Sequence, residues 1–143
     1  MQLTRKTEYA VRTLLELATR TEGEYVPTEE IARAKNIPEM YLSKTVQDLV
    51  RAGFVQTQRG SGGGVRLARP AESFTLADVV EAIQGPLAIN SCLLENSDCP
   101  NKPVCRVHRL LARAQESLLD VLGSANFAEL AGKNQKGERG GEQ

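Results

Sequence analysis

The sequence predicts a mainly α-helical chain with one small β-hairpin, arranged as a winged helix-turn-helix domain followed by a long dimerisation helix. Three observations predict this class. Apolar residues recur at helical spacing along much of the 143 residues. Two short helices joined by a tight turn follow a longer first helix, and a glycine-rich hairpin pattern comes directly after them. We place the winged helix-turn-helix in residues 1–73, a cysteine loop with the dimerisation helices in 74–130, and a disordered tail in 131–143.

The first helix is expected from Thr4 to Arg20. Its apolar positions repeat at helical spacing and are Ala10, Val11, Leu14, Leu17 and Ala18. Glu8 and Arg12 lie one turn apart on this helix. That spacing suits an exposed ion pair worth about 0.2–0.5 kcal/mol.

A helix-turn-helix is expected next. Thr28 should be the N-cap of a short helix that ends at Ala34, with Ile31 and Ala34 facing inward. The Asn-Ile-Pro sequence at 36–38 breaks this helix, and a second helix is expected over 39–52. The apolar positions of the second helix are Met40, Leu42, Val46, Leu49 and Val50.

The other face of that second helix carries polar side chains that suit phosphates and base edges in a DNA major groove. These are Tyr41, Ser43, Lys44, Gln47 and Arg51. A polar face that is merely solvated would show the same residues, so the helix alone leaves both interpretations open.

Two alternating segments, 54–58 and 65–67, flank a glycine-rich run that starts at Arg59. This pattern predicts a hairpin, or wing, directly after the second helix. Its glycines, Gly60 among them, let the backbone approach a phosphate closely. Arg59 and Arg66 are expected to bring charge to the tip, where an arginine can enter a minor groove. Because no Gly-Lys-Ser/Thr follows the glycines, a P-loop nucleotide site is not indicated.

Two further short helices carry clear start signals. Thr75 and Asp78 are spaced as a capping box, and Gly85 ends the helix that they begin. Four apolar residues of this helix should pack inward, namely Leu76, Val79, Val80 and Ile83. Asn126 and Glu129 are spaced as a second capping box for a last short helix.

The longest helix is expected from Val104 to Gly123. It carries what reads as one continuous apolar stripe, formed by Val107, Leu110, Leu111, Ala114, Leu118, Val121 and Leu122. A long apolar stripe on a small protein needs a cover. A second copy of the same helix is the economical cover and gives a twofold homodimer. Packing on the chain's own front half is the alternative, and the two are compatible.

The stretch from Cys92 to His108 holds all three cysteines and the only histidine of the chain. The residues between them are loop formers, and thiolate and imidazole are ligands that iron–sulfur clusters and zinc prefer. There is no Cys-x-x-Cys pair of the zinc-finger kind. Ordinary structural cysteines would be scattered along apolar runs, and the odd thiol count without a signal peptide disfavours a secreted disulfide framework. A bound cofactor is therefore the favoured interpretation.

Net charge is zero, but its distribution is uneven. Residues 1–70 carry 11 Lys/Arg against 8 Asp/Glu, and residues 71–143 carry 7 against 10. A basic front half is compatible with DNA binding. No run approaches the ~20 apolar residues that span a bilayer, so we expect a cytoplasmic protein with reduced thiols and no membrane partner. With one histidine and no paired acid or nucleophile, neither an enzyme nor a small-molecule substrate is indicated.

Four sequence features carry a resemblance to a known family. They are the opening Leu3-Thr4 with Tyr9-Ala10-Val11-Arg12, the helix start Met40-Tyr41-Leu42, the wing Arg59-Gly60-x-Gly62-Gly63-Gly64, and the three-cysteine loop. Over about residues 1–130 the chain resembles the winged-helix, iron–sulfur-cluster transcriptional regulators of the IscR and NsrR type. The resemblance implies a homodimer with crossing long helices, wings that bind a double-stranded DNA operator, and a cluster in each subunit that controls operator affinity.

By the same resemblance, Cys92, Cys99 and Cys105 are cluster ligands and His108 is the favoured fourth ligand of a 2Fe-2S cluster. Six residues separate Cys92 from Cys99, one more than in the usual IscR loop. Glu8 of the partner subunit is the alternative fourth ligand, as in NsrR-like members, where a 4Fe-4S cluster responds to nitric oxide or iron. Other interpretations are a cluster-free thiol regulator, a structural zinc module and an electron-transfer protein.

Overall fold

The structure of the chain is a computed structural model that describes residues 2–94 and 97–132. Its elements are α1 (Arg5–Ala18), α2 (Thr28–Lys35), α3 (Glu39–Arg51), β1 (Val55–Gln58), β2 (Gly64–Leu67), η1 (Ala71–Ser73), α4 (Leu76–Gln84), η2 (Ser91–Leu93), η3 (Lys102–Val104), α5 (Arg106–Leu122) and α6 (Phe127–Leu130). The expected mainly helical class with one antiparallel hairpin is confirmed. Most of the predicted tail, 133–143, lies outside the described residues.

Helix α1 is the centre of the packed body. Thr4 begins it as an N-cap, because its Oγ1 accepts a hydrogen bond from the Thr7 amide at 3.1 Å. Helices α2, α3, α4 and α6 all contact α1. Leu14 in its middle is fully buried, so the helix is covered on its apolar side by elements from both ends of the sequence.

Three phenylalanines extend this core toward the C-terminus. Phe54 and Phe74 meet edge to face with ring centroids 5.0 Å apart, and Phe74 and Phe127 lie 4.9 Å apart. The Phe127 amide also donates to the Phe74 carbonyl at 3.1 Å. One core therefore runs across residue 73, where we place the end of the first domain; that division stays a prediction.

The start of α2 differs from the expectation. Pro27 is the N-cap and Thr28 is already helical, so the expected Thr28 cap is wrong. The cause is the preceding residue, because Val26 exchanges two backbone hydrogen bonds with Val65 of the hairpin, at 2.8 and 2.9 Å. This pairing holds the chain extended up to Pro27. The inward side of α2 is formed by Ile31 and Ala32, while Ala34 is exposed.

Helix α3 buries three of its five apolar positions. Leu42, Val46 and Leu49 are buried, but Met40 is 74% exposed and Val50 is 42% exposed. Helical geometry explains the difference. Each residue advances about 100° around the axis, so Met40 lies about 120–180° from the three buried positions, on the opposite face.

The hairpin has the register expected of a wing. Gln56 pairs with Arg66, and Gln58 pairs with Gly64 at its outer end. Gly64 has φ 143°, and a Cβ built on it would lie 2.1 Å from the Val26 carbonyl oxygen. Glycine is thus required there by close backbone approach, which fixes the wing against the segment before α2.

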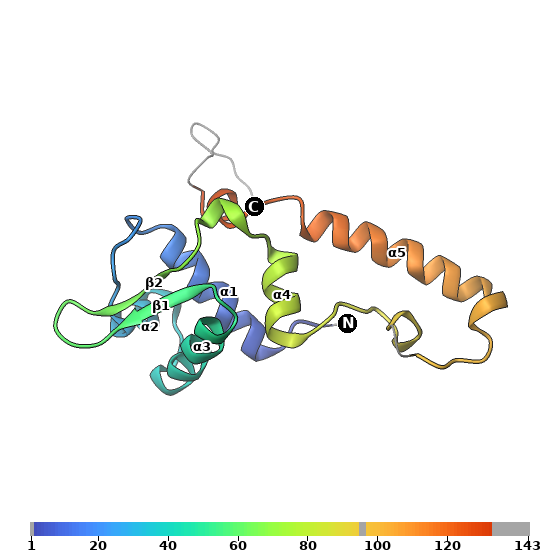
Figure 1. Cartoon of the computed structure of the whole chain (residues 1–143), viewed down its shortest axis with the longest axis horizontal. Coiled ribbons are helices and arrows are strands. Elements are labelled where there is room, and N and C mark those ends of the chain that lie inside the picture. Colours follow the sequence, from blue (N-terminus) through green and yellow to red (C-terminus); the bar gives the residue numbers. More distant parts are fainter. Residues whose placement is uncertain (1, 95–96, 133–143) are drawn as a thin grey trace.

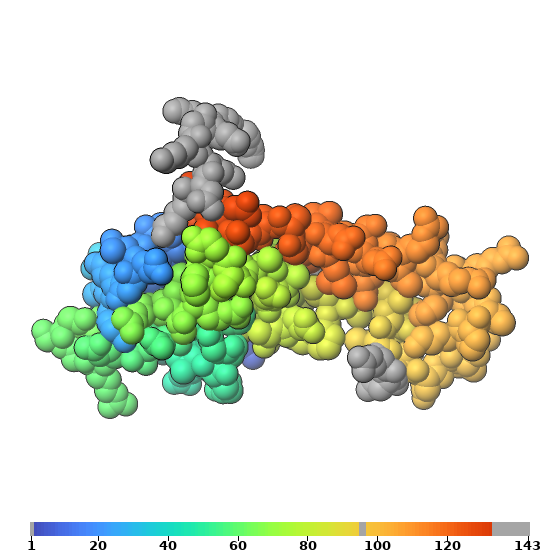
Figure 2. Space-filling model, turned by 45° about the horizontal axis from the view of Figure 1, so that its top comes forward, coloured from blue at the N-terminus to red at the C-terminus, as the bar shows by residue number. Residues whose placement is uncertain are grey.

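The part of the chain between α4 and α6 forms an arm. The Thr75–Asp78 capping box is present, and Gly85 ends α4 with φ 98°. The chain then leaves the body, passes through the cysteine loop and returns along α5 (Figure 1). The wing and the loop lie at opposite ends of the long axis, and the space-filling view shows the same separation (Figure 2). The second expected capping box, Asn126 with Glu129, is present at α6.

Helix α5 buries none of its residues in the single chain. The residues of the expected apolar stripe lie on one side of the helix but differ in exposure. A half-buried strip consists of Leu111, Gln115, Leu118, Leu119 and Leu122. An adjacent exposed strip consists of Val107, Leu110, Ala114, Ser117 and Val121. Among the described residues, no helix is long and apolar enough to cross a membrane.

Candidate nucleic-acid interface and metal centre

The polar face of α3 is exposed as the sequence predicts. Its five candidate residues, Tyr41, Ser43, Lys44, Gln47 and Arg51, are all exposed. The buried carboxylate of Asp48 lies beneath this face and contacts two cations. Its Oδ1 accepts from Arg51 Nη1 at 3.0 Å, and its Oδ2 lies 3.8 Å from Lys6 Nζ of α1. Asp48 is only 6% exposed, so this carboxylate ties both cations to the base of the polar face.

An aromatic contact also links α3 to α1. The rings of Tyr41 and Tyr9 stack with centroids 5.8 Å apart. The guanidinium of Arg12 lies 5.6 Å from the Tyr9 centroid, which is a cation–π distance. Arg12 therefore contacts Tyr9, while Glu8 lies 4.0 Å from Arg5. The expected exposed pair between Glu8 and Arg12 is not formed.

The wing tip carries one of its two expected arginines. Arg59 and Gly60 are exposed at the turn, and Gly60 has φ 91°. The expected tip position is wrong for Arg66, because Arg66 pairs with Gln56 two positions back along the ladder. Its guanidinium lies 4.5 Å from the Tyr25 ring centroid and is half-buried. A role of Arg66 in DNA binding stays a prediction.

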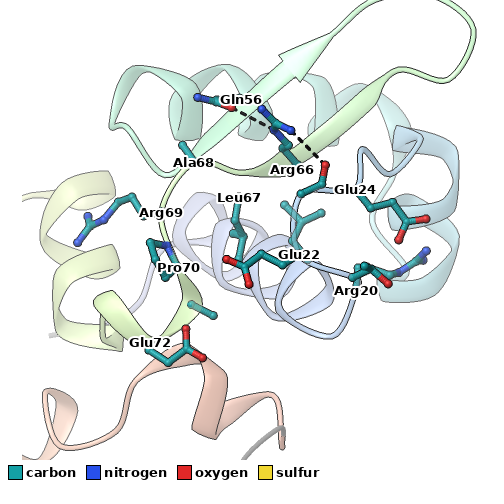
Figure 3. Close-up of a pocket in the computed structure, with 14 residues that line it drawn as sticks. Arg20, Glu22, Glu24, Gln56, Arg66, Leu67, Ala68, Arg69, Pro70 and Glu72 are labelled. Atoms are coloured by element: carbon teal, nitrogen blue, oxygen red, sulfur yellow. Dashed lines mark hydrogen bonds between the residues drawn. The ribbon is translucent and has the colours of Figure 1, made fainter.

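Arg66 instead lines a polar hollow at the base of the wing (Figure 3). Its Nε donates to Gln56 Oε1 at 3.1 Å and its Nη1 donates to the Gly23 carbonyl at 3.1 Å, which are the dashed contacts in the figure. Arg20, at another wall, donates to Glu16 at 2.8 Å and to Glu30 at 3.0 Å. The hydrogen bond to Glu16, followed by that to Glu30, raises the pKa of Arg20 above its ordinary value. These contacts brace the wing against the α1–α2 connection.

The cysteine loop brings two thiols to the only histidine. Cys92 Sγ lies 3.3 Å from His108 Nδ1, a hydrogen-bond contact whose direction depends on the imidazole tautomer. Cys105 is the N-cap of α5, and its Sγ accepts from the His108 amide at 3.3 Å. Asn90 Nδ2 also donates to Cys92 Sγ, at 3.4 Å. Cys92 thus contacts the imidazole of His108, whereas Cys105 contacts its backbone amide.

The remaining candidate ligands are not part of this group. Cys99 is exposed, and all three thiols are free. Residues 95 and 96, inside the loop, lie outside the described residues. Within 2–94 and 97–132 no three His, Cys, Asp or Glu residues are gathered closely enough to hold a metal ion. The donor chemistry, three thiols and an imidazole, nevertheless fits an iron–sulfur cluster or zinc.

Glu8 occupies an accessible position on α1. Its side chain is 44% exposed, and it lines two shallow hollows. One hollow is shared with Tyr9, Arg12 and the turn at 36–38, and the other with the N-terminal segment. The structure places Glu8 in the body and the three cysteines on the arm, so a shared site would use Glu8 of the partner subunit.

Two glutamines that sequence reasoning missed anchor the loop at its ends. Gln84, the last residue of α4, accepts from the Thr4 amide at 3.0 Å and donates to the Gln2 carbonyl at 3.0 Å. Gln115 of α5 accepts from the Ile89 amide at 2.8 Å. A glutamine on a helix normally reads as a solvated residue, and no sequence signal separates these two from such residues.

The exposed strip on α5 is the candidate dimer surface. Val107, Leu110 and Val121 are 63%, 62% and 68% exposed, and Val104 just before the helix is 75% exposed. Leu110, Ala114 and Ser117 also line a shallow hollow in this strip. Large apolar groups repeated along one helix face indicate a covering partner.

Comparisons with known proteins agree with this geometry. A family model, Rrf2, described as an iron-dependent transcriptional regulator, matches residues 3–133. The chain is 42% identical over 132 residues to protein aau3 of Rhizobium meliloti strain 1021, and the match covers 91% of this chain and 84% of that protein.

Solved structures give the same fold. The structure of CymR (YrzC), titled the global cysteine regulator of B. subtilis, matches with a TM-score of 0.76 at 25% identity, covering 94% of this chain and 98% of that one. The oxidised form of Staphylococcus aureus CymR matches with a TM-score of 0.69 at 25% identity, covering 92% and 97%. IscR of T. potens matches with a TM-score of 0.71 at 22% identity, covering 99% and 94%.

Proposed function

Because the chain belongs to the Rrf2 family of transcriptional regulators, we propose that it is a dimeric, operator-binding regulator whose affinity for DNA is set by an iron–sulfur cluster, with 2Fe-2S favoured. The observation that carries the proposal is the contact of Cys92 Sγ with His108 Nδ1 at 3.3 Å, one helical turn from Cys105. Thiolate and imidazole are donors that iron–sulfur clusters accept, and here they come from two separate segments of the arm.

Cys92, Cys99, Cys105 and His108 would hold the cluster, with Glu8 of the partner subunit as the alternative fourth ligand. When bound, the cluster would make the protein responsive to iron, oxidants and nitric oxide. Gathering these side chains at one point would require Cys99 to join the other two thiols. The segment between Cys92 and Cys105 would then be fixed against the first turn of α5.

Two sets of contacts lead from that loop to the DNA-reading face. Gln115 ties the loop to the half-buried side of α5, next to the candidate dimer strip. Gln84 ties the start of the loop to the N-terminus of α1 through Gln2 and Thr4. From α1, Lys6 contacts Asp48 and Tyr9 contacts Tyr41, both on α3.

We infer that ordering the loop changes the placement of α3 relative to the dimer axis by these two routes. A coupling free energy of ~1–3 kcal/mol would change operator affinity ~5–150-fold, which is sufficient for a switch. By this account Lys44, Gln47, Arg59 and Gly60 contact DNA directly, and Asp48 and Tyr9 position their neighbours.

The first test measures the cluster itself. Protein purified without oxygen should contain iron and acid-labile sulfide and absorb in the visible range, with about two irons per chain for 2Fe-2S and about four for 4Fe-4S. Cys92→Ala, Cys99→Ala and Cys105→Ala should each lose iron and the response of operator affinity to oxidant. Ser91→Ala is the matched control and should keep both. Unchanged iron content in all three cysteine variants would refute the proposal.

The fourth ligand is tested separately. His108→Ala should change the visible spectrum and lower iron retention if His108 is the ligand, whereas Glu8→Gln should leave both unchanged. The reverse result assigns the site to Glu8 of the partner subunit and favours an NsrR-like 4Fe-4S regulator. Circular dichroism of both variants separates ligand loss from unfolding.

A cluster-free thiol regulator is the second candidate. The observation that favours it is the exposure of Cys99 apart from the Cys92–His108 contact, together with the likeness to CymR, one structure of which is titled an oxidised form. In that case anaerobically prepared protein would be colourless and lack iron. Its operator affinity would follow the oxidation of Cys99, which mass spectrometry of the intact chain detects.

A further inference from the structure

The exposed face of α3 has an apolar side chain, Met40, in the same row as its polar groups. Met40 is 74% exposed and is the second residue of the helix. At about 100° per residue, positions 40, 44, 47 and 51 fall within about 60° of arc around the helix axis. Met40, Lys44, Gln47 and Arg51 therefore form one row along the centre of the exposed face, opposite buried Leu42 and Leu49.

The place of Met40 within this row determines what it can touch. In helix-turn-helix proteins the N-terminal residues of the recognition helix contact base edges, while flanking groups contact the backbone. Met40 is at the N-terminal end, and Arg51 is at the C-terminal end beside Asp48. Tyr41 is held against Tyr9, so Met40 is the apolar side chain of this end that stands free of an aromatic stack.

The side chains of this row on α3 indicate which kind of molecule binds there. Lys44 and Arg51 favour a polyanion rather than an apolar protein surface, and Gln47 can pair with a base edge. In a major groove the apolar group offered to a protein is the C5-methyl of thymine. An unbranched thioether with three rotatable bonds can pack on that methyl without a fixed geometry.

We propose that Met40 reads a thymine methyl group in each half of the operator and is a specificity-determining residue of this protein. The inference rests on the proposed function as an operator-binding protein and adds the base that one side chain recognises. Lys44 and Arg51 would hold the helix on the phosphates, and Met40 would exclude water from the methyl and from its own exposed surface.

The experiment uses the full chain prepared without oxygen. Duplexes selected by the wild-type protein from a random pool give the operator. Each thymine is then replaced in turn by deoxyuridine, which removes only the methyl group, and the dissociation constant is measured by fluorescence anisotropy. One thymine in a half-site should show about fourfold weaker binding after replacement, the equivalent of ~0.8 kcal/mol for one buried methyl group.

Two variants assign that effect to Met40. In Met40→Ala the deoxyuridine and thymine operators should bind equally at that position, because the partner of the methyl is gone. In Met40→Leu, which keeps an apolar side chain, the discrimination should remain. Thermal unfolding of both variants confirms that a residue exposed in the wild type has been changed without loss of the fold.

Three results would overturn the inference. One is specific binding with no thymine sensitive to methyl removal, and another is equal sensitivity in wild type and Met40→Ala. A third is unchanged DNA binding by Met40→Ala with altered association between copies of the chain, which would make Met40 a protein contact. If the wild type selects no duplex at all, the proposed function itself fails, and this outcome is distinct from the other three.

Discussion

The body and the arm of this protein differ in how far each buries its own apolar side chains. In the body, residues from α1 through α4 and from α6 share one buried core, and Phe74 and Phe127 at its C-terminal side are fully buried. Along the described part of residues 85–126, by contrast, Leu87 alone is buried. The body is therefore stabilised by its own packing, whereas the arm requires something outside the single chain, a second copy or a bound group, to cover it.

The largest expected effect tests whether the body is stabilised by its own core. Phe74→Ala should lower the free energy of unfolding by about 3–5 kcal/mol, because it removes a fully buried ring that contacts two others. Urea unfolding followed by circular dichroism measures it. Val121→Ala on the exposed strip is the matched control and should change the unfolding of the monomer by less than about 0.5 kcal/mol. Similar losses for both variants would remove the contrast between body and arm.

The next effect concerns the arm. Leu110→Asp should weaken the dimer at least ~150-fold, since burial of each leucine contributes ~1.5–3 kcal/mol and a twofold interface loses both copies. Sedimentation equilibrium measures the dissociation constant. Ala112→Asp adds the same charge to an exposed position across the helix and should leave the dimer intact. Equal effects of the two changes would mean that the exposed strip is not the dimer surface.

A smaller effect is expected at the joint between wing and body. Gly64→Ala would place a Cβ against the Val26 carbonyl, so either the wing shifts or the Val26–Val65 pairing breaks, at a cost above ~1 kcal/mol. Operator affinity should fall with it. Gly53→Ala, outside the wing, is the control, because a Cβ there meets no atom and only the backbone strain of φ 87° remains. Thermal unfolding and DNA titration of both variants separate strain from steric overlap.

The smallest expected effect tests communication between the two regions. Gln84→Leu removes two hydrogen bonds at a partly exposed site, so stability should fall by only ~1–2 kcal/mol. The ratio of operator affinities with and without the cluster should shrink toward one. Gln115→Leu removes the hydrogen bond to the Ile89 amide and leaves α1 unchanged. It therefore shows whether the rest of the affinity change depends on the contacts through α5. An unchanged affinity ratio in Gln84→Leu would exclude the α4–α1 route.

Much of the body was predictable because local signals there agree with the tertiary contacts. The inner positions of α3, both capping boxes and the hairpin follow from periodicity, cap residues and glycine content. The expectations that were wrong depend on pairing between separate segments. Thr28 is not a cap because Val26 is paired with Val65, and Arg66 is not at the wing tip because the ladder pairs it with Gln56.

The candidate ligands stand out in the sequence, but their arrangement does not follow from it. Clustering of the cysteines and the histidine is a property of the sequence, whereas the approach of Cys92 to His108 depends on how α5 folds back beside the loop. The glutamine contacts of Gln84 and Gln115 carry no pattern at all, since each joins residues far apart in the chain. Periodicity alone lists Met40 among the apolar positions of α3, although its angular position already separates it from buried Leu42.

The pairing of Thr75 with Asn126 gives the arm the topology of an insertion. The chain leaves the body after Gly85, only nine helical residues or ~13 Å beyond Thr75, and re-enters it at Asn126. A linker of a few residues would span that gap and close the body on itself. A segment inserted in this way can be lengthened, given other side chains or replaced entirely while the DNA-binding body stays the same.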